Sequence, residues 1–96
     1  MGASVFTHIA HGKSAKEAFS NARQDALYNH GHGGYTGTIA EKDSFVTINV
    51  PAGRDPREYA EELIDTCDPR VDDKWGPAGC IAIGNGRFLF FGWASS

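Results

Sequence analysis

One short segment near the C-terminus limits how this chain can fold. Residues 87–93 have the pattern of a β-strand, and the centre of that strand, Phe88-Leu-Phe-Phe91, is apolar on both faces. Successive side chains of a strand point to opposite faces, so both faces of this strand need a covering layer. The strand therefore lies at the centre of a sheet, or a second chain covers one of its sides. The second possibility predicts a homo-oligomer, and we expect a homodimer.

Four further segments have the alternation or the apolar run that is typical of strands. They are residues 4–10, 36–40, 45–50 and 80–83. In the third of them, Val46, Ile48 and Val50 alternate with Phe45, Thr47 and Asn49, and we expect Val46 and Ile48 to face the core. Gly84-Asn85-Gly86 predicts a type I′ turn before the last strand, because Asn and Gly tolerate positive φ angles.

Two helices are predicted from their start signals. Ser14-Ala-Lys-Glu17 forms a capping box, and the helix that it begins runs to His30, with Gly31 as a left-handed C-cap. Its apolar face consists of small residues and one aromatic residue: Ala15, Ala18, Phe19, Ala22 and Ala26.

The second helix starts at Asp55, with Pro56 at the first helical position and Glu58 at the third. Asp68-Pro69 ends it. The buried stripe predicted for this helix is Ala60, Leu63, Ile64 and Cys67.

These segments give the order β-α-β-β-α-β-β for a single domain over residues 1–96. Such a succession predicts an α+β fold. We expect a two-layer sandwich in which two helices lie on one face of an antiparallel or mixed sheet.

Composition and charge exclude several classes of protein. The chain has 9 Lys and Arg against 12 Asp and Glu, a net charge of −3, which disfavours a basic nucleic-acid binder. No apolar run approaches the roughly 20 residues that span a bilayer. The N-terminal residues lack the pattern of a signal peptide, and two cysteines are too few for a disulfide framework. We therefore expect a cytoplasmic protein without contact to a membrane.

The chain holds 12 glycines, and they crowd into the segment that follows the first helix. This segment reads His30-Gly-His-Gly-Gly-Tyr-Thr-Gly-Thr38. Together with Arg87 it supplies the candidate residues for binding a ligand or a partner: His30, His32, Gly33, Gly34, Tyr35, Thr36 and Arg87.

Four interpretations of this loop stay open. Its histidines could ligate a metal ion with His8, although a helix of roughly 25 Å separates His11 from His30. Its backbone amides could hold a nucleotide or an anion, with a base stacked on Tyr35. The glycines could serve turns alone. The loop could also be a surface that contacts another protein.

The residues give little support for catalysis, and no cofactor or catalytic residue is predicted. Cys67 and Cys80 both fall on segments predicted to be buried. The acidic residues of the second helix are expected to form a solvated face, or a surface complementary to a basic partner. No activated nucleophile or acid–base pair stands out.

The sequence resembles a family of small uncharacterised proteins encoded by bacteriophages, particularly those of actinobacteria, whose function is not established. The resemblance covers nearly the whole chain. It rests on Ala18-Phe19, on the block His30-Gly-His-Gly-Gly-Tyr-Thr-Gly-Thr-Ile-Ala-Glu-Lys42, on Lys74-Trp-Gly-Pro-Ala-Gly79 and on Phe90-Phe-Gly-Trp-Ala94. It implies a phage accessory protein that acts in the host cytoplasm.

We therefore expect a non-enzymatic binding module that engages a host or phage protein, with the Gly-rich loop and the acidic second helix as its surfaces. The alternative is a protein that binds or sequesters a small ligand, a nucleotide or an anion, through the same loop.

Overall fold

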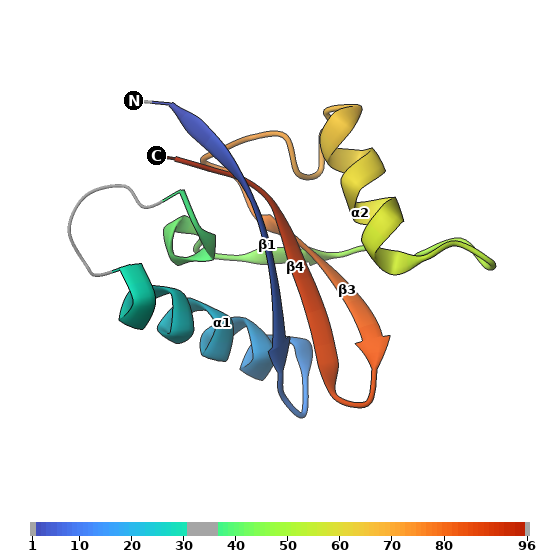
Figure 1. The fold of residues 1–96 in the computed structure, drawn as a ribbon, viewed down its shortest axis with the longest axis horizontal. Coiled ribbons are helices and arrows are strands. Elements are labelled where there is room, and N and C mark those ends of the chain that lie inside the picture. Colours follow the sequence, from blue (N-terminus) through green and yellow to red (C-terminus); the bar gives the residue numbers. More distant parts are fainter. Residues whose placement is uncertain (1, 31–36, 96) are drawn as a thin grey trace.

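Two helices and a four-stranded sheet make up the described part of the chain, residues 2–30 and 37–95, in the computed structural model (Figure 1). In chain order the elements are β1 (Ala3–His11), α1 (Ala15–His30), the 3₁₀ turn η1 (Ile39–Glu41), β2 (Phe45–Thr47), α2 (Pro56–Asp65), β3 (Ala78–Gly84) and β4 (Arg87–Ser95). The predicted α+β class is confirmed, and so is the order of helices and strands, apart from the second predicted strand, whose place is taken by η1.

The strands lie in the order β1-β4-β3-β2. β4 pairs antiparallel with both β1 and β3, and β2 pairs parallel with β3, so the sheet is mixed. The predicted turn between β3 and β4 is confirmed by positive φ angles of 57° at Asn85 and 72° at Gly86. The strand that is apolar on both faces is thus central, and one chain alone covers both of its faces.

The predicted capping box begins α1. The Ser14 hydroxyl accepts a hydrogen bond from the Glu17 amide at 3.2 Å, and the Glu17 carboxylate accepts one from the Lys13 amide at 3.0 Å. These contacts satisfy amides that the first turn of a helix leaves without partners. The expected C-cap, Gly31, lies outside the described residues.

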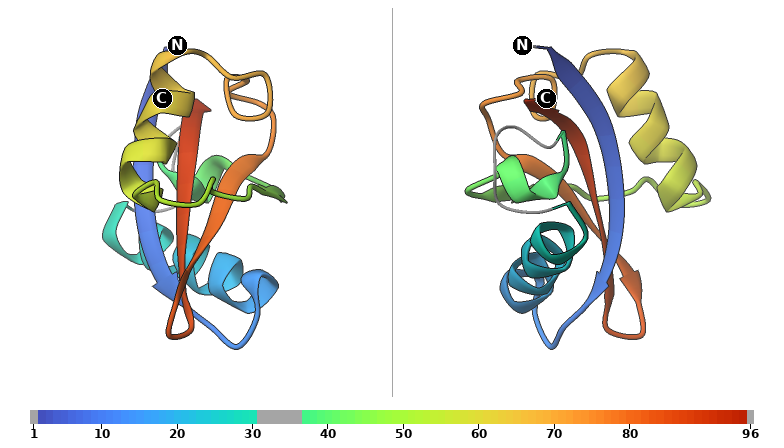
Figure 2. Two further views of the ribbon diagram at one scale, coloured as in Figure 1. Left: turned by 90° about the vertical axis from the view of Figure 1, so that its right-hand side faces the viewer. Right: turned by 60° about the vertical axis from the view of Figure 1, so that its left-hand side comes forward.

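Two separate cores lie on the two faces of the sheet. The core under α1 holds the alanine face of that helix together with Phe6 and Phe90. The core under α2 holds Leu63, Leu89 and Phe91. In Figure 2 the sheet separates the two helices. The α+β fold therefore has a helical layer on each face of its sheet.

The expectation that both helices share one face is wrong. Parallel strands such as β2 and β3 need a crossover connection, and here α2 is that connection. It packs on the face that α1 leaves open, where the odd-numbered side chains of β4 need cover. The positions of the two helices along the sequence do not indicate which face of the sheet each helix covers.

The segment 36–40 is not a strand in its described part. Thr38 caps η1 instead, because its hydroxyl accepts a hydrogen bond from the Ala40 amide at 3.2 Å. Ile39 and Ala40 are buried in the α1 core, so the apolar pattern reflects burial without strand pairing. The strand expected over 45–50 is shortened to 45–47, although Ile48 is buried as predicted and its amide bonds to Cys80.

The end of α2 also differs from the prediction. The sequence predicts Cys67 on the buried stripe, but Cys67 is exposed, with a φ of 53°. Its amide donates to the Ile64 carbonyl at 3.1 Å, and the next amide, of Asp68, donates to the Leu63 carbonyl at 3.0 Å. This pair of bonds is a Schellman motif, which turns the chain before the helical period can bury Cys67.

A buried lysine fixes the connection between α2 and β3. Lys42 is 1% exposed, and its ammonium group donates to the carbonyls of Asp73, Lys74 and Gly76 at 2.9–3.3 Å. Burial lowers the pKa of this group, and the charge of Asp73 opposes that shift. The three acceptors match the three donors of an ammonium group.

No helix in the described ranges is long and apolar enough to cross a membrane.

Candidate functional site

Most of the residues predicted for a site lie outside the part of the chain that the structure describes. His32, Gly33, Gly34, Tyr35 and Thr36 lie outside the described residues, and of His30 only the position at the end of α1 is described. Arg87 is exposed at the start of β4, opposite His11. Because α1 begins just after β1 and is about 24 Å long, Arg87 lies near the opposite end of α1 from His30. One small ligand could not touch both residues.

The described surface offers another candidate, the outer edge of β1. This strand is nine residues long and stands at the end of the sheet, so no described strand pairs with its outer edge. At the opposite end of the sheet, β2 has only three residues. A strand edge presents backbone donors and acceptors that another chain can pair with. β1 is thus the longer of the two exposed edges.

The ladder between β1 and β4 determines which backbone groups face outward. The Gly12 amide donates to the Gly86 carbonyl at 3.0 Å, and these two residues extend the β1–β4 register by one position. Hydrogen-bonded and non-hydrogen-bonded pairs alternate along an antiparallel ladder, so the even-numbered residues of β1 bond to β4. The N–H and C=O groups of the odd-numbered residues point away from the sheet. These residues are Ala3, Val5, Thr7, Ile9 and His11.

Two large apolar side chains lie exposed on the same strand. Val5 is 46% exposed and Ile9 is 37% exposed. Both lie on the same face of the sheet as α2, but α2 covers β3 and β4 and not β1. Apart from its two histidines the strand contains no acidic or basic residue, and it contains no proline or glycine. Proteins commonly place such residues, or bulges, on edge strands to prevent pairing with other chains. β1 lacks these protective residues.

A polar stripe of α1 runs beside this edge. Asn21, Asp25 and Asn29 follow one another at intervals of four residues, so they share one side of the helix. The Asn21 amide group donates to the outward-facing His11 carbonyl at 2.9 Å, and Asp25 lies 3.2 Å from the imidazole of His8. We call the outer edge of β1 together with this stripe the edge groove.

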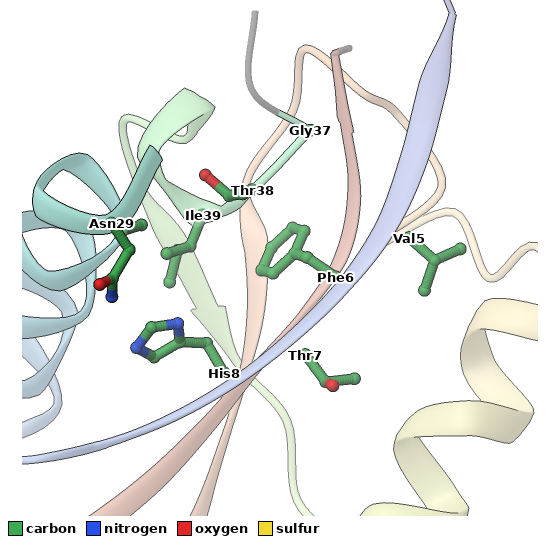
Figure 3. A pocket seen from close by; sticks show the side chains of 9 residues that line it. Val5, Phe6, Thr7, His8, Asn29, Gly37, Thr38 and Ile39 are labelled. Carbon is green, nitrogen blue, oxygen red and sulfur yellow. The ribbon is translucent and has the colours of Figure 1, made fainter. Parts of the chain in front are cut away.

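Two hollows lie in the edge groove, one on each side of His8. The first has a volume of about 280 Å³ and the second about 320 Å³. In Figure 3 the His8 ring points into the first hollow, toward Asn29. The first volume is just below the range for ligand pockets, roughly 300–1,000 Å³, and the second is at its low end. They suit side chains of a neighbouring strand, whose alternate residues point to the same face.

The other face of β1 has an apolar hollow of about 230 Å³. Ile9 forms one side of it, Ile83 and Leu89 form its floor, and the first residues of α2 close it. The exposed Ile9 side chain therefore belongs to an apolar surface that continues across three strands.

The two cysteines differ in their surroundings. Cys80 is 1% exposed in the α1 core, and burial raises the pKa of its thiol to about 11. A thiol of this kind is a poor nucleophile, because the thiolate is the reactive form. Cys67 is exposed. In the described ranges no three His, Cys, Asp or Glu side chains form a group that could hold a metal ion.

The acidic surface of α2 is partly neutralised by arginines. Arg54 lies 3.1 Å from Glu62, and Arg70 lies 2.9 Å from Asp68. The hydrogen bond from the Arg70 side chain lowers the pKa of Asp68. These contacts agree with a solvated face on α2. They also leave less unpaired negative charge on that face for a basic partner to bind.

The alternation of residues 4–10 was visible in the sequence, but the position of that strand at the edge was not. Strand order depends on which distant segments pair, and a single sequence carries no local signal for it. The absence of charge between Ala3 and His11 was the one clue available.

No family model, curated protein or solved structure matches this chain.

Proposed function

We propose that the protein is a non-enzymatic binding module that engages another protein by strand addition along β1. In this mode an extended segment of the partner pairs with a sheet edge: main-chain hydrogen bonds supply affinity, and hollows for alternate side chains supply specificity. The edge groove has both elements. It offers outward backbone groups on every second residue and two hollows on the α1 side.

The observation that carries the proposal is the exposed, uncharged edge of a nine-residue strand. The resemblance described above favours a partner from a bacteriophage or its host, met in the host cytoplasm. The strand that first suggested a homodimer, β4, is covered by its own chain, so self-association needs another surface.

The test uses two proline variants at matched positions. Thr7→Pro removes an outward-facing amide from β1 and leaves the bonds to β4 in place. Thr47→Pro is the control on β2: the Ile48 amide bonds to β3, so by alternation the Thr47 amide faces the other way. Proline is tolerated where an edge amide faces outward.

Wild-type protein immobilised on beads is exposed to lysate of the host and to lysate of phage-infected cells. We expect one or more proteins retained by wild type and by Thr47→Pro to be lost with Thr7→Pro. Capture that Thr7→Pro leaves unchanged, with its circular dichroism spectrum intact, would contradict strand addition at β1.

The small-ligand alternative makes a different prediction. A ligand that binds the folded state raises the unfolding temperature. Nucleotides and inorganic phosphate that raise it by several degrees, with Thr7→Pro responding as wild type does, would favour that alternative.

A further inference from the structure

We infer that β1 of a second copy of this chain occupies the edge groove when no other partner does, antiparallel and related by a twofold axis through Thr7. This inference rests on the proposed strand addition and names its first occupant. It also gives the expected homodimer an interface, which β4 cannot provide because its own chain covers both of its faces.

The side-chain pattern of β1 selects the register. Val5 and Ile9 are equally distant from Thr7 along the strand. A twofold axis at Thr7 brings Val5 of each copy opposite Ile9 of the other, because a symmetric interface repeats every contact. The two exposed apolar residues then cover one another twice, and Thr7 faces its own symmetry mate. Cross-strand pairs of β-branched residues stabilise a sheet.

The backbone agrees with this register. Outward-facing groups occur at odd-numbered residues, so pairing must set odd-numbered residues opposite odd-numbered residues. The axis at Thr7 meets this condition and overlaps the whole strand from Ala3 to His11. Moving the axis to Val5 or to Ile9 also meets it, but shortens the overlap and leaves one apolar residue without its counterpart.

Charge favours the same surface. The chain has a net charge of −3, so two copies repel each other, most strongly through the acidic segment around α2. The strand Ala3–His11 has no acidic or basic residue other than its histidines. A strongly charged segment would find no opposite charge on β1, whereas β1 of a second copy is equally neutral. Two negative copies can therefore meet here with little repulsion from the strands themselves.

Self-pairing joins the two sheets into one continuous sheet and uses the backbone groups that a partner protein would need. The homodimer and the partner complex therefore exclude one another along β1. A bound partner is expected to dissociate the homodimer.

Charge variants at the two apolar positions test the register. Val5→Lys alone and Ile9→Glu alone each place a charge opposite an apolar residue at two symmetric positions. We expect each to weaken self-association about tenfold or more. Thr47→Lys is the matched control, an exposed residue on the opposite edge of the sheet, and is expected to associate as wild type does. Sedimentation equilibrium measures the association constants, and circular dichroism checks folding.

Two combinations are diagnostic for the register. A mixture of the Val5→Lys and Ile9→Glu proteins is expected to form heterodimers, in which the new lysine faces the new glutamate and the unchanged Val5 faces the unchanged Ile9. The double variant is expected to form homodimers again, with two such ion pairs.

Three results would overturn the inference: a wild-type protein that stays monomeric at millimolar concentration, a dimer that both single variants leave intact, or folded single variants that fail to combine. The proposed function is tested separately by capture on the Thr7→Pro protein. If wild type is monomeric and Thr7→Pro still abolishes capture, self-pairing alone is wrong. If Thr7→Pro leaves capture unchanged, strand addition itself is wrong.

Discussion

Phe90 and Phe91 are adjacent in β4, yet their rings lie in different cores. The Phe90 ring packs against Phe19 of α1, with 5.5 Å between ring centroids. Phe91 packs in the core under α2. Both side chains are fully buried. One central strand therefore ties two helical layers to a single sheet, and each layer depends on one of these rings.

Replacing either ring tests this arrangement. Phe90→Ala and Phe91→Ala are each expected to lower the free energy of unfolding by about 3–5 kcal/mol, because each leaves a cavity in a closed core. Urea denaturation measures both. Phe88→Ala is the control, since Phe88 is only partly buried and should cost less. An unchanged midpoint for Phe91→Ala would show that α2 does not cover this face.

The exposed cysteine at the end of α2 predicts a stabilising substitution. Cys67 adopts a φ of 53°, which costs roughly 1–2 kcal/mol for a residue with a Cβ atom and little for glycine. Cys67→Gly is therefore expected to raise the free energy of unfolding by about 1 kcal/mol. Cys67→Ala removes the thiol but keeps the Cβ atom, so it should give no such gain. Equal stability of the two variants would contradict the assigned cap.

The buried Lys42 predicts a large loss of stability on substitution. Lys42→Met keeps most of the side-chain volume but leaves three carbonyl groups without their donor. We expect a loss of about 3 kcal/mol or more, because a buried polar group without a partner costs about 1–3 kcal/mol. Lys13→Met, at an exposed position, is expected to change stability by less than about 0.5 kcal/mol. Thermal unfolding of the two variants compares them directly.

Local signals explain what the sequence predicts well. The start of α1 depends on Ser14 and Glu17, and the start of α2 depends on Asp55, all within four residues of the backbone groups that they cap. The turn at Asn85 and Gly86 depends on the conformational freedom of those two residues alone. Such features need no information from distant parts of the chain.

Non-local contacts explain the errors. Ile39 and Ala40 belong to a segment with the pattern of a strand, but they are buried against α1 as part of a 3₁₀ turn. The opposite placement of the helices follows from the parallel pairing of β2 and β3. The edge groove needs both strand order and the position of α1, so neither Val5 nor His8 could be assigned to it from spacing.

The two cysteine thiols are expected to differ in their reaction with an alkylating reagent, because one is exposed and the other is buried. Burial raises the pKa of the Cys80 thiol to about 11, and the side chain is closed to solvent, so Cys80 is expected to resist alkylation at pH 8. Cys67 is exposed and is expected to react. Mass spectrometry after iodoacetamide treatment should show one label on the folded protein and two on the protein unfolded in urea. The Cys67→Ser variant should show no label on the folded protein and one label on the unfolded protein.

Because the pKa of the Cys80 thiol returns to its ordinary value on unfolding, the folded state loses stability as the pH rises from the ordinary thiol range through about 11. Rapid labelling of Cys80 in the folded protein at pH 8 would contradict its place in the α1 core.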